Sequence, residues 1–309
     1  MIVTVTLNPA VDKTGELERL TPGSVNRLTS IRQDPGGKGI NVSKSLKVLG
    51  ADSTAMGLLG GSSGAWIVQA LSALKISCDF VTTQSPTRTN LKLIDSVSGE
   101  TTDINEPGQY CEKMELFEIT RKLSGILKAD DIVVFSGSLP PGVSSSIYAD
   151  WTVQCKEAGA RAFVDADGES LQLAVDKIPY AIKPNEHELS RLCGKPLCSV
   201  EELCTQGMRL VESGIHLVTV SMGSRGALFL SENERYYSPG IRVQAKSTVG
   251  AGDAMMAAIA FGEHNSLMLK ETAVLAVALS AASVMQSGTQ GADPAVVKEL
   301  QTKVVLERL

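Results

Sequence analysis

Short apolar runs rich in β-branched residues alternate with helix-forming segments along most of this chain. Residues 2–7 are the first such run, and residues 215–221 form a later one that is apolar almost throughout. Strands of this kind are buried on both faces, and their alternation with helices is typical of a mainly parallel sheet. We therefore expect an α/β fold. Further strands are expected at 54–59, 131–135, 161–164 and 180–182, and helices at 40–49, 64–75, 145–157, 186–192, 200–212, 254–262 and 270–286.

One region interrupts the alternation. Residues 87–95 and 100–105 are extended runs joined by Ser98 and Gly99, a pattern that predicts an antiparallel hairpin. No long linker, internal repeat or low-complexity tract divides the chain. We expect a single domain over 1–309, with a small antiparallel β-lid built discontinuously from about 12–35 and 87–106.

Composition excludes several classes of function. The net charge is −5 and aromatic residues make up 4% of the chain, which argues against a nucleic-acid groove. The longest apolar runs are too short or too interrupted to span a membrane, and the N-terminus reads as a strand, so a cytoplasmic protein is expected. The six cysteines form no CxxC pair, so we expect reduced thiols and no zinc site.

The sequence STVGAGD at 247–253 is the strongest chemical signal. Two glycines precede an Ala/Met-rich segment that should be helical, and the free N–H groups of a helix start attract phosphate. Asp253 stands at the mouth of this anion site, where phosphate repels it unless the carboxylate has another task. Accepting the proton of an attacking hydroxyl is such a task. The alternative is that Asp253 merely caps the helix.

Other polar groups follow expected strands or begin expected helices. Asp12 follows the first strand, where α/β proteins bind ligands, although a turn-stabilising role is equally open. The turn PGGKGIN at 35–41 places Lys38 at its apex, yet it lacks the spacing of a P-loop. Arg88, Asn90 and Lys92 alternate along one strand face, which suits a sugar phosphate or an exposed hairpin surface.

Three further loops complete the set. The sequence SGSLPPG at 136–142 follows an expected strand, and SMGSRG at 221–226 is a glycine turn that could approach a nucleotide. In KPNEHE at 183–188, Asn185 and Glu188 share one helical face, so their oxygens could hold Mg²⁺ through water. A capping box formed by the same two residues is the competing interpretation.

Taken jointly and in this order, the motifs resemble the PfkB branch of the ribokinase-like sugar kinases over essentially the whole chain. The matching segments are 8–12, 36–42, 137–140, 183–188, 221–226 and 247–253. The last of these is the most specific. Lys246, directly before it, departs from many members of the family.

The resemblance implies a Rossmann-like α/β/α sandwich with a β-lid over the sugar, ATP and Mg²⁺ as cofactors, and a homodimer formed through the lids. Asp253 would be the general base, and the turn Gly250, Ala251 and Gly252 the anion hole. The sugar phosphate would be held by Asp12, Arg27, Gly37, Lys38, Asn41, Arg88, Asn90, Lys92, Asn105 and Ser138. ATP would be held by Lys183, Asn185, Ser221, Gly223, Gly226, Thr248, Gly250 and Gly252, and Mg²⁺ by Asn185 and Glu188.

The substrate expected from the resemblance is fructose 1-phosphate. The strand TRTNLKL at 87–93 is most similar to that of family members that phosphorylate this sugar. Kinases of tagatose 6-phosphate and of fructose 6-phosphate remain alternatives. A sugar-phosphate sensor without catalysis is an alternative of another class, against which the intact Asp253 argues.

Overall fold

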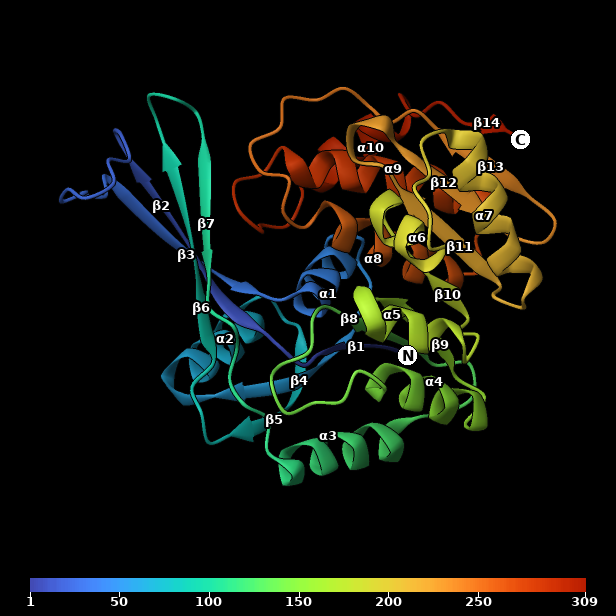
Figure 1. The fold of residues 1–309 in the computed structure, drawn as a ribbon, viewed down its shortest axis with the longest axis horizontal. Helices are drawn as coiled ribbons and strands as arrows, with labels where there is room; N and C mark the ends of the chain where they lie inside the picture. The colour runs from blue at the N-terminus through green and yellow to red at the C-terminus, as the bar shows by residue number, and fades with distance from the viewer.

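The computed structural model describes residues 1–309, and a ten-stranded sheet forms its centre (Figure 1). Its strands are β1 (Ile2–Thr6), β4 (Thr54–Gly60), β5 (Ser77–Thr83), β8 (Ile132–Ser136), β9 (Arg161–Asp165), β10 (Ala181–Ile182), β11 (Leu217–Ser221), β12 (Ala227–Leu230), β13 (Arg235–Ser238) and β14 (Glu307–Arg308). They lie in the order β14-β13-β12-β11-β10-β9-β8-β1-β4-β5. From β11 to β5 every neighbouring pair is parallel, and the remaining pairs are antiparallel.

Helices cover both faces of this sheet. One face packs against α3 (Lys113–Ile126), α4 (Ile147–Glu157), α5 (Gly168–Val175), α6 (Glu186–Leu192) and α7 (Val200–Glu212). The other packs against α1 (Lys38–Val48), α2 (Gly61–Ala73), α8 (Ala251–His264), α9 (Leu269–Val284) and α10 (Pro294–Gln301). Each face has its own apolar core, which confirms the predicted α/β/α sandwich.

Helices α8 and α9 are apolar on nearly every side, and both are therefore buried along most of their length. Their small side chains, such as Ala254, Ala257 and Ala276, are fully buried and let neighbouring backbones approach closely. On the opposite face, the rings of Tyr148 and Trp151 lie 5.8 and 5.5 Å from that of Phe135 on β8. These contacts hold the carboxyl end of β8, where polar residues of the site begin.

All strands and helices expected from the sequence are present, with ends shifted by a few residues. Gly50 ends α1 as predicted, with a φ of 80° and its N–H bonded to the carbonyl of Lys47. The elements that the pattern did not predict are β5, α3, α5, β12, β13, α10 and β14.

A second, four-stranded sheet stands at one side of the body, and we call it the lid sheet (Figure 1). Its strands, in spatial order, are β3 (Ser30–Gly36), β2 (Ala10–Leu17), β6 (Arg88–Asp95) and β7 (Thr101–Asn105). The predicted β6–β7 hairpin is antiparallel, but β2 pairs with β6 in parallel, so the sheet is mixed rather than wholly antiparallel. The pairing of β2 with β6 joins chain segments far apart in sequence, which local pattern cannot reveal.

The parallel strands end at one edge of the main sheet, facing the lid sheet. Asn8 follows β1, while Ser136 and Asp165 end β8 and β9 opposite one another. Asn185 bridges to Ser221, the last residue of β11. Such an edge is where open α/β sheets bind ligands. None of the helices is both long and apolar enough to traverse a lipid bilayer.

Candidate active site

A cavity of about 670 Å³ lies between the carboxyl ends of the strands and the lid sheet. Val249 is its one hydrophobic lining residue, so the cavity suits a ligand with phosphate and hydroxyl groups. The residues singled out in the sequence that line it are Asp12, Gly37, Lys38, Asn41, Arg88, Asn90, Lys92, Asn105, Ser138, Lys183, Asn185, Glu188, Ser221, Gly223, Gly250, Gly252 and Asp253.

Helix α8 begins at the floor of this cavity. Its N-cap is Gly250, whose φ of 87° lies in the left-handed region that glycine adopts without strain. Asp253 is the third residue of the helix and does not cap it, so the capping interpretation is wrong. No side chain caps the first turn, and its N–H groups are free to bind an anion at the positive end of the helix.

The carboxylate of Asp253 is buried and held by one neighbour. Asn41 on α1 donates a hydrogen bond from Nδ2 to Asp253 Oδ2 at 2.9 Å. Burial and the nearby Asp165 raise the pKa of Asp253 to about 6, against the opposing influence of Lys38, Asn41 and Lys183. A carboxylate with this pKa is ionised at neutral pH and accepts a proton more readily than an exposed one.

Two lysines share one buried carboxylate beside Asp253. Asp165 at the end of β9 forms ion pairs with Lys38 Nζ at 3.1 Å and with Lys183 Nζ at 3.2 Å. Burial alone would raise the pKa of Asp165, but the two ammonium groups outweigh it and hold the pKa below its usual range. The charge of Asp165 in turn raises the pKa of Lys38. The arrangement keeps two cations at the cavity, and Lys183 Nζ lies on the side of Gly252 where a side chain would stand.

The lid sheet contributes acceptors for hydroxyl groups. Asn90 donates to Asp12 Oδ1 at 2.9 Å, and burial raises the pKa of Asp12. The amide oxygens of Asn90 and Asn41 are buried without a hydrogen-bond partner. Buried polar atoms are nearly always satisfied, so two unpaired acceptors lining one cavity indicate where a ligand donates.

The cations of the lid sheet are more engaged than their spacing suggested. Arg88 donates to the backbone carbonyls of Asn8, Pro9 and Glu106 at 3.1, 3.4 and 2.7 Å. These bonds use three of the five N–H groups of its guanidinium. Lys92 lies 3.5 Å from the carboxylate of Asp103 on β7. Arg88 therefore also fixes the loops around the lid sheet.

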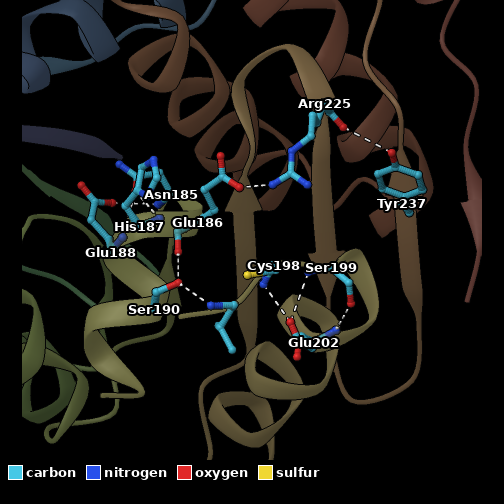
Figure 2. Close-up of polar contacts among 11 residues, drawn as sticks. Asn185, Glu186, His187, Glu188, Ser190, Cys198, Ser199, Glu202, Arg225 and Tyr237 are labelled. Carbon is cyan, nitrogen blue, oxygen red and sulfur yellow. Dashed lines mark hydrogen bonds and ion pairs between the residues drawn. The ribbon is translucent and has the colours of Figure 1, made fainter. Parts of the chain in front are cut away.

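The opposite end of the cavity begins at α6, and Figure 2 shows its polar contacts. Asn185 and Glu188 form the capping box that competed with metal binding. Asn185 Oδ1 accepts from the N–H groups of His187 and Glu188 at 2.9 Å, and Glu188 Oε2 accepts from the N–H of Asn185 at 2.7 Å. The amide oxygen of Asn185 is thus engaged, whereas Glu188 keeps one carboxylate oxygen unengaged at the cavity.

Two further contacts drawn in Figure 2 hold the glycine turn at 223–226 in place. Glu186 forms an ion pair with Arg225, and the carbonyl of Arg225 accepts from the hydroxyl of Tyr237 on β13 at 3.3 Å. These contacts join the start of α6 to the loop after β11, the two segments predicted to hold a nucleotide.

Four predicted site residues do not line the cavity. Arg27 and Thr248 are exposed, Ala251 lies in the first turn of α8, and Gly226 packs against the backbone of Ser238. At a φ of 89°, Gly226 closes a structural turn. None of the four residues therefore contributes to the wall of the cavity.

Sequence reasoning missed Asp165, the centre of the charge network, and its neighbour Asp167. Asp165 ends β9 and Asp167 follows that strand, and the position at a strand end was an available signal. Asp165 has no glycine beside it, although Gly168 directly follows Asp167. The loop residues Gly288 and Thr289 also line the cavity and gave no signal, because they reach it from the far end of α9.

Comparison with known proteins bears on this geometry. The family model described as "pfkB family carbohydrate kinase" matches residues 5–296 of this chain. The chain belongs to the pfkB family of carbohydrate kinases. The 1-phosphofructokinase of Xanthomonas campestris pv. campestris is 39% identical, over 98% of this chain and 97% of its own. That of Escherichia coli K12 is 32% identical, over 99% of this chain and 98% of its own.

A solved structure shares the fold of this pfkB-family kinase. Phosphofructokinase-2 from Escherichia coli, in complex with substrates and products, matches with a TM-score of 0.94 and 30% identity over 98% of both chains. The family and the fold expected from the motifs are thus confirmed.

Proposed function

We propose that this kinase transfers the γ-phosphoryl group of ATP to the C6 hydroxyl of fructose 1-phosphate, which yields fructose 1,6-bisphosphate and ADP. The observation that carries the proposal is the buried Asp253 beside the uncapped start of α8. The full-length likeness to several 1-phosphofructokinases supports the choice of sugar.

In this proposal Asp253 accepts the proton of the C6 hydroxyl as its oxygen attacks the γ-phosphorus. The bond from that phosphorus to the bridging oxygen breaks, and ADP leaves. The N–H groups of the turn Gly250–Asp253 and the ammonium of Lys183 bind the charge that gathers on the transferred group. The work of this chain is mostly positioning and electrostatics, as is usual in phosphoryl transfer.

The remaining groups orient the two substrates. Asp12, Asn41 and Asn90 accept hydrogen bonds from sugar hydroxyls, and Lys38, Arg88 and Lys92 face the phosphate of the sugar. Gly223 and Ser221 line the end of the cavity assigned to ATP. Mg²⁺ bound to ATP phosphates would neutralise charge there. Glu188, with its unengaged oxygen, fits such an ion through water better than Asn185, whose oxygen is occupied.

The proposal includes a homodimer formed through the lid sheets. Side chains alternate across a strand, so Ile104 points away from the cavity that its neighbours Asp103 and Asn105 line. Ile104 is 54% exposed and Ile31 is 58% exposed. These two exposed apolar side chains stand on the two edge strands of the lid sheet, and exposed apolar side chains favour burial against a second copy. The solution mass of the protein tests this, with Ile104→Lys expected to give a monomer.

The test of function is a coupled kinase assay with fructose 1-phosphate, tagatose 6-phosphate, fructose 6-phosphate, ribose and fructose. We expect the highest kcat/KM for fructose 1-phosphate. Fructose 6-phosphate is the second candidate, because a solved structure similar to this chain is Escherichia coli phosphofructokinase-2 with that sugar phosphate. A higher kcat/KM for either 6-phosphate would reject the substrate assignment. ATP binding without turnover on any sugar would favour a sensor.

A further inference from the structure

Lys44 is a lysine in the interior of the protein to which the proposed chemistry gives no task. It is 7% exposed and lies on α1, three residues after Asn41. Its Nζ donates to the carbonyl of Pro35 at 2.9 Å and to the hydroxyl of Thr289 at 3.0 Å. Burying an ammonium group is costly, and an apolar side chain of similar volume often packs as stably. Stability alone therefore does not explain this lysine.

Lys44 completes a row of polar side chains on one face of α1. Lys38, Asn41 and Lys44 are spaced by three residues, and positions three apart are neighbours on a helix. Lys38 donates to Asp165 at the end of β9, and Asn41 donates to Asp253 on α8. Lys44 contacts the end of β3 and the loop between α9 and α10. One helix thus connects the cationic pair, the general base and the lid sheet.

The contacts of Lys44 lie where the lid sheet meets the body. Pro35 is near the end of β3, and its neighbour Asp34 is paired in register with Asp12 on β2. Asp34 forms an ion pair with Arg32 at 2.9 Å, and the Cα of Gly288 packs directly against that pair. Gly288 and Thr289 also line the cavity. A shift of β3 relative to α1 would therefore move both Asp12 and the cavity wall.

The charge of Lys44 has partners on three elements. Asp34 of β3, Asp12 of β2 and Asp253 of α8 favour its ammonium form, while Arg32 of β3 opposes it. Burial outweighs the carboxylates and lowers the pKa of Lys44 to about 8. The ammonium thus interacts electrostatically with Asp12 and Asp253, although Lys44 itself does not line the cavity.

We propose that Lys44 is a positioning residue that holds β3 of the lid sheet and the α9–α10 loop in place relative to Asp253. It acts on the sugar through Asp12 and does not touch the substrate. The kinetic part of this inference rests on the proposed function, whereas the effect on the lid sheet does not. Loss of Lys44 weakens sugar binding and leaves ATP binding unchanged, since Lys44 forms its hydrogen bonds with Pro35 and Thr289 and with no residue assigned to ATP.

The experiment compares Lys44→Met, Thr289→Val and the control Lys47→Met. Lys47 lies on the same helix in an exposed pair with Asp52, which is 90% exposed and contributes little. We expect Lys44→Met to raise KM for fructose 1-phosphate at least about tenfold, equal to ~1.4 kcal/mol. KM for ATP should stay within about twofold, which is ~0.4 kcal/mol. Thr289→Val should change the same constant in the same direction by less, and Lys47→Met should change nothing.

Amide hydrogen exchange of the free protein supplies a second readout, independent of the reaction. In Lys44→Met the amides of β2 and β3 should exchange at least about tenfold faster, while those of β1 and β4 keep their protection. Wild-type sugar KM and wild-type exchange in Lys44→Met would overturn the inference. Equal rises in both KM values with uniformly faster exchange would also overturn it, because they indicate general destabilisation.

Two further outcomes of the experiment also have a defined meaning. If Lys44→Met does not fold, Thr289→Val decides, and wild-type kinetics and exchange in that variant overturn the inference. If the wild-type protein phosphorylates no sugar phosphate, the proposed function fails, while the exchange of β2 and β3 still tests the role of Lys44.

Discussion

Asn41 and Asp253 meet across 2.9 Å although 212 positions separate them in the chain. Asn41 stands on α1, which begins at the glycine turn, and Asp253 on α8, which begins at the anion site. The bond reaches one carboxylate oxygen, Oδ2, and favours the ionised form of Asp253. It therefore lowers the pKa that burial raises. The pKa of the proposed base is set by burial first, and then by the surrounding charges and this one hydrogen-bond donor.

The pH profile of kcat/KM should follow Asp253. Its pKa of about 6 means that the base is protonated as pH falls through that value, so kcat/KM should drop about tenfold per unit below it. Asn41→Ala removes a hydrogen bond to the charged form, worth ~1.5–3 kcal/mol, and should move the acid limb upward by roughly one unit or more. Ser43→Ala on the same helix serves as control, because its hydroxyl bonds Thr4. If the acid limb of the profile does not move in Asn41→Ala, the limb does not report the titration of Asp253.

Asp253→Asn should bind ATP normally and lose turnover. Asparagine has nearly the same shape but cannot accept the proton, and removing a general base typically costs on the order of 10²–10⁴ in rate. The measurement is kcat beside the affinity for ATP. A variant that keeps more than about a third of wild-type kcat would remove Asp253 from the role of base.

The same substitution should stabilise the fold at neutral pH. A folded-state pKa of about 6 lies above the ordinary 3.8 for an aspartate, so ionised Asp253 opposes folding. Its contribution to stability is complete below about pH 4 and is lost as pH rises through 6. The penalty at pH 7 is on the order of 2–3 kcal/mol. Asp253→Asn should therefore raise Tm at pH 7 and have little effect near pH 4. Equal shifts at both pH values would contradict this.

The fold was predictable because periodicity is local. A few consecutive residues are enough to predict the buried strands that end at Thr6 and Ser136 and the helix that begins at Lys38. The parallel pairing of β2 with β6 is not, since it depends on segments nearly eighty positions apart. Helix α3 escaped prediction because its buried positions, such as Ile119 and Leu123, are few among charged residues.

The site was predictable where glycine turns and strand ends coincide, and no further. Lys38 and Lys183 could be named as cations near a ligand. Asp165 could have been named from its place at a strand end, but its pairing with both lysines could not, because the pair with Lys38 spans 127 positions. Arg88 was assigned to a phosphate from its face of the strand, yet three of its donors bind backbone carbonyls of other segments. A sequence shows which groups share a face but does not show which of them are already engaged.

Gly252→Ala should lower kcat strongly and change Tm little. A Cβ at this position would lie 3.1 Å from Lys183 Nζ, so the lysine must move by a few tenths of an ångström. Gly252 is helical, and its conformation is open to alanine, which favours helices. Displacing Lys183 from the anion turn should lower kcat by about tenfold or more, as loss of part of an anion hole does. The comparison is kcat against Tm. A fall in Tm with unchanged kcat would make Gly252 a structural residue.

Arg88→Ala tests whether its two remaining N–H groups bind the sugar phosphate. A charge-assisted hydrogen bond contributes ~1.5–3 kcal/mol, so losing it should raise KM for fructose 1-phosphate by roughly ten- to a hundredfold. KM for ATP should barely change, since Arg88 stands on the lid sheet. Arg88→Ala also removes the bonds to the carbonyls of Asn8 and Glu106, and a loss of loop order alone could weaken sugar binding.

Unphosphorylated fructose separates these two causes. If Arg88 binds the phosphate, the variant loses activity with fructose 1-phosphate and keeps whatever weak activity the wild type has with fructose. If Arg88 only orders the loops, both activities fall by the same factor. Arg88→Lys keeps the charge but lacks the planar fork, so it should recover part of the phosphate affinity without restoring all three carbonyl bonds. Equal losses for both sugars in Arg88→Ala, with no recovery in Arg88→Lys, would remove Arg88 from the phosphate site.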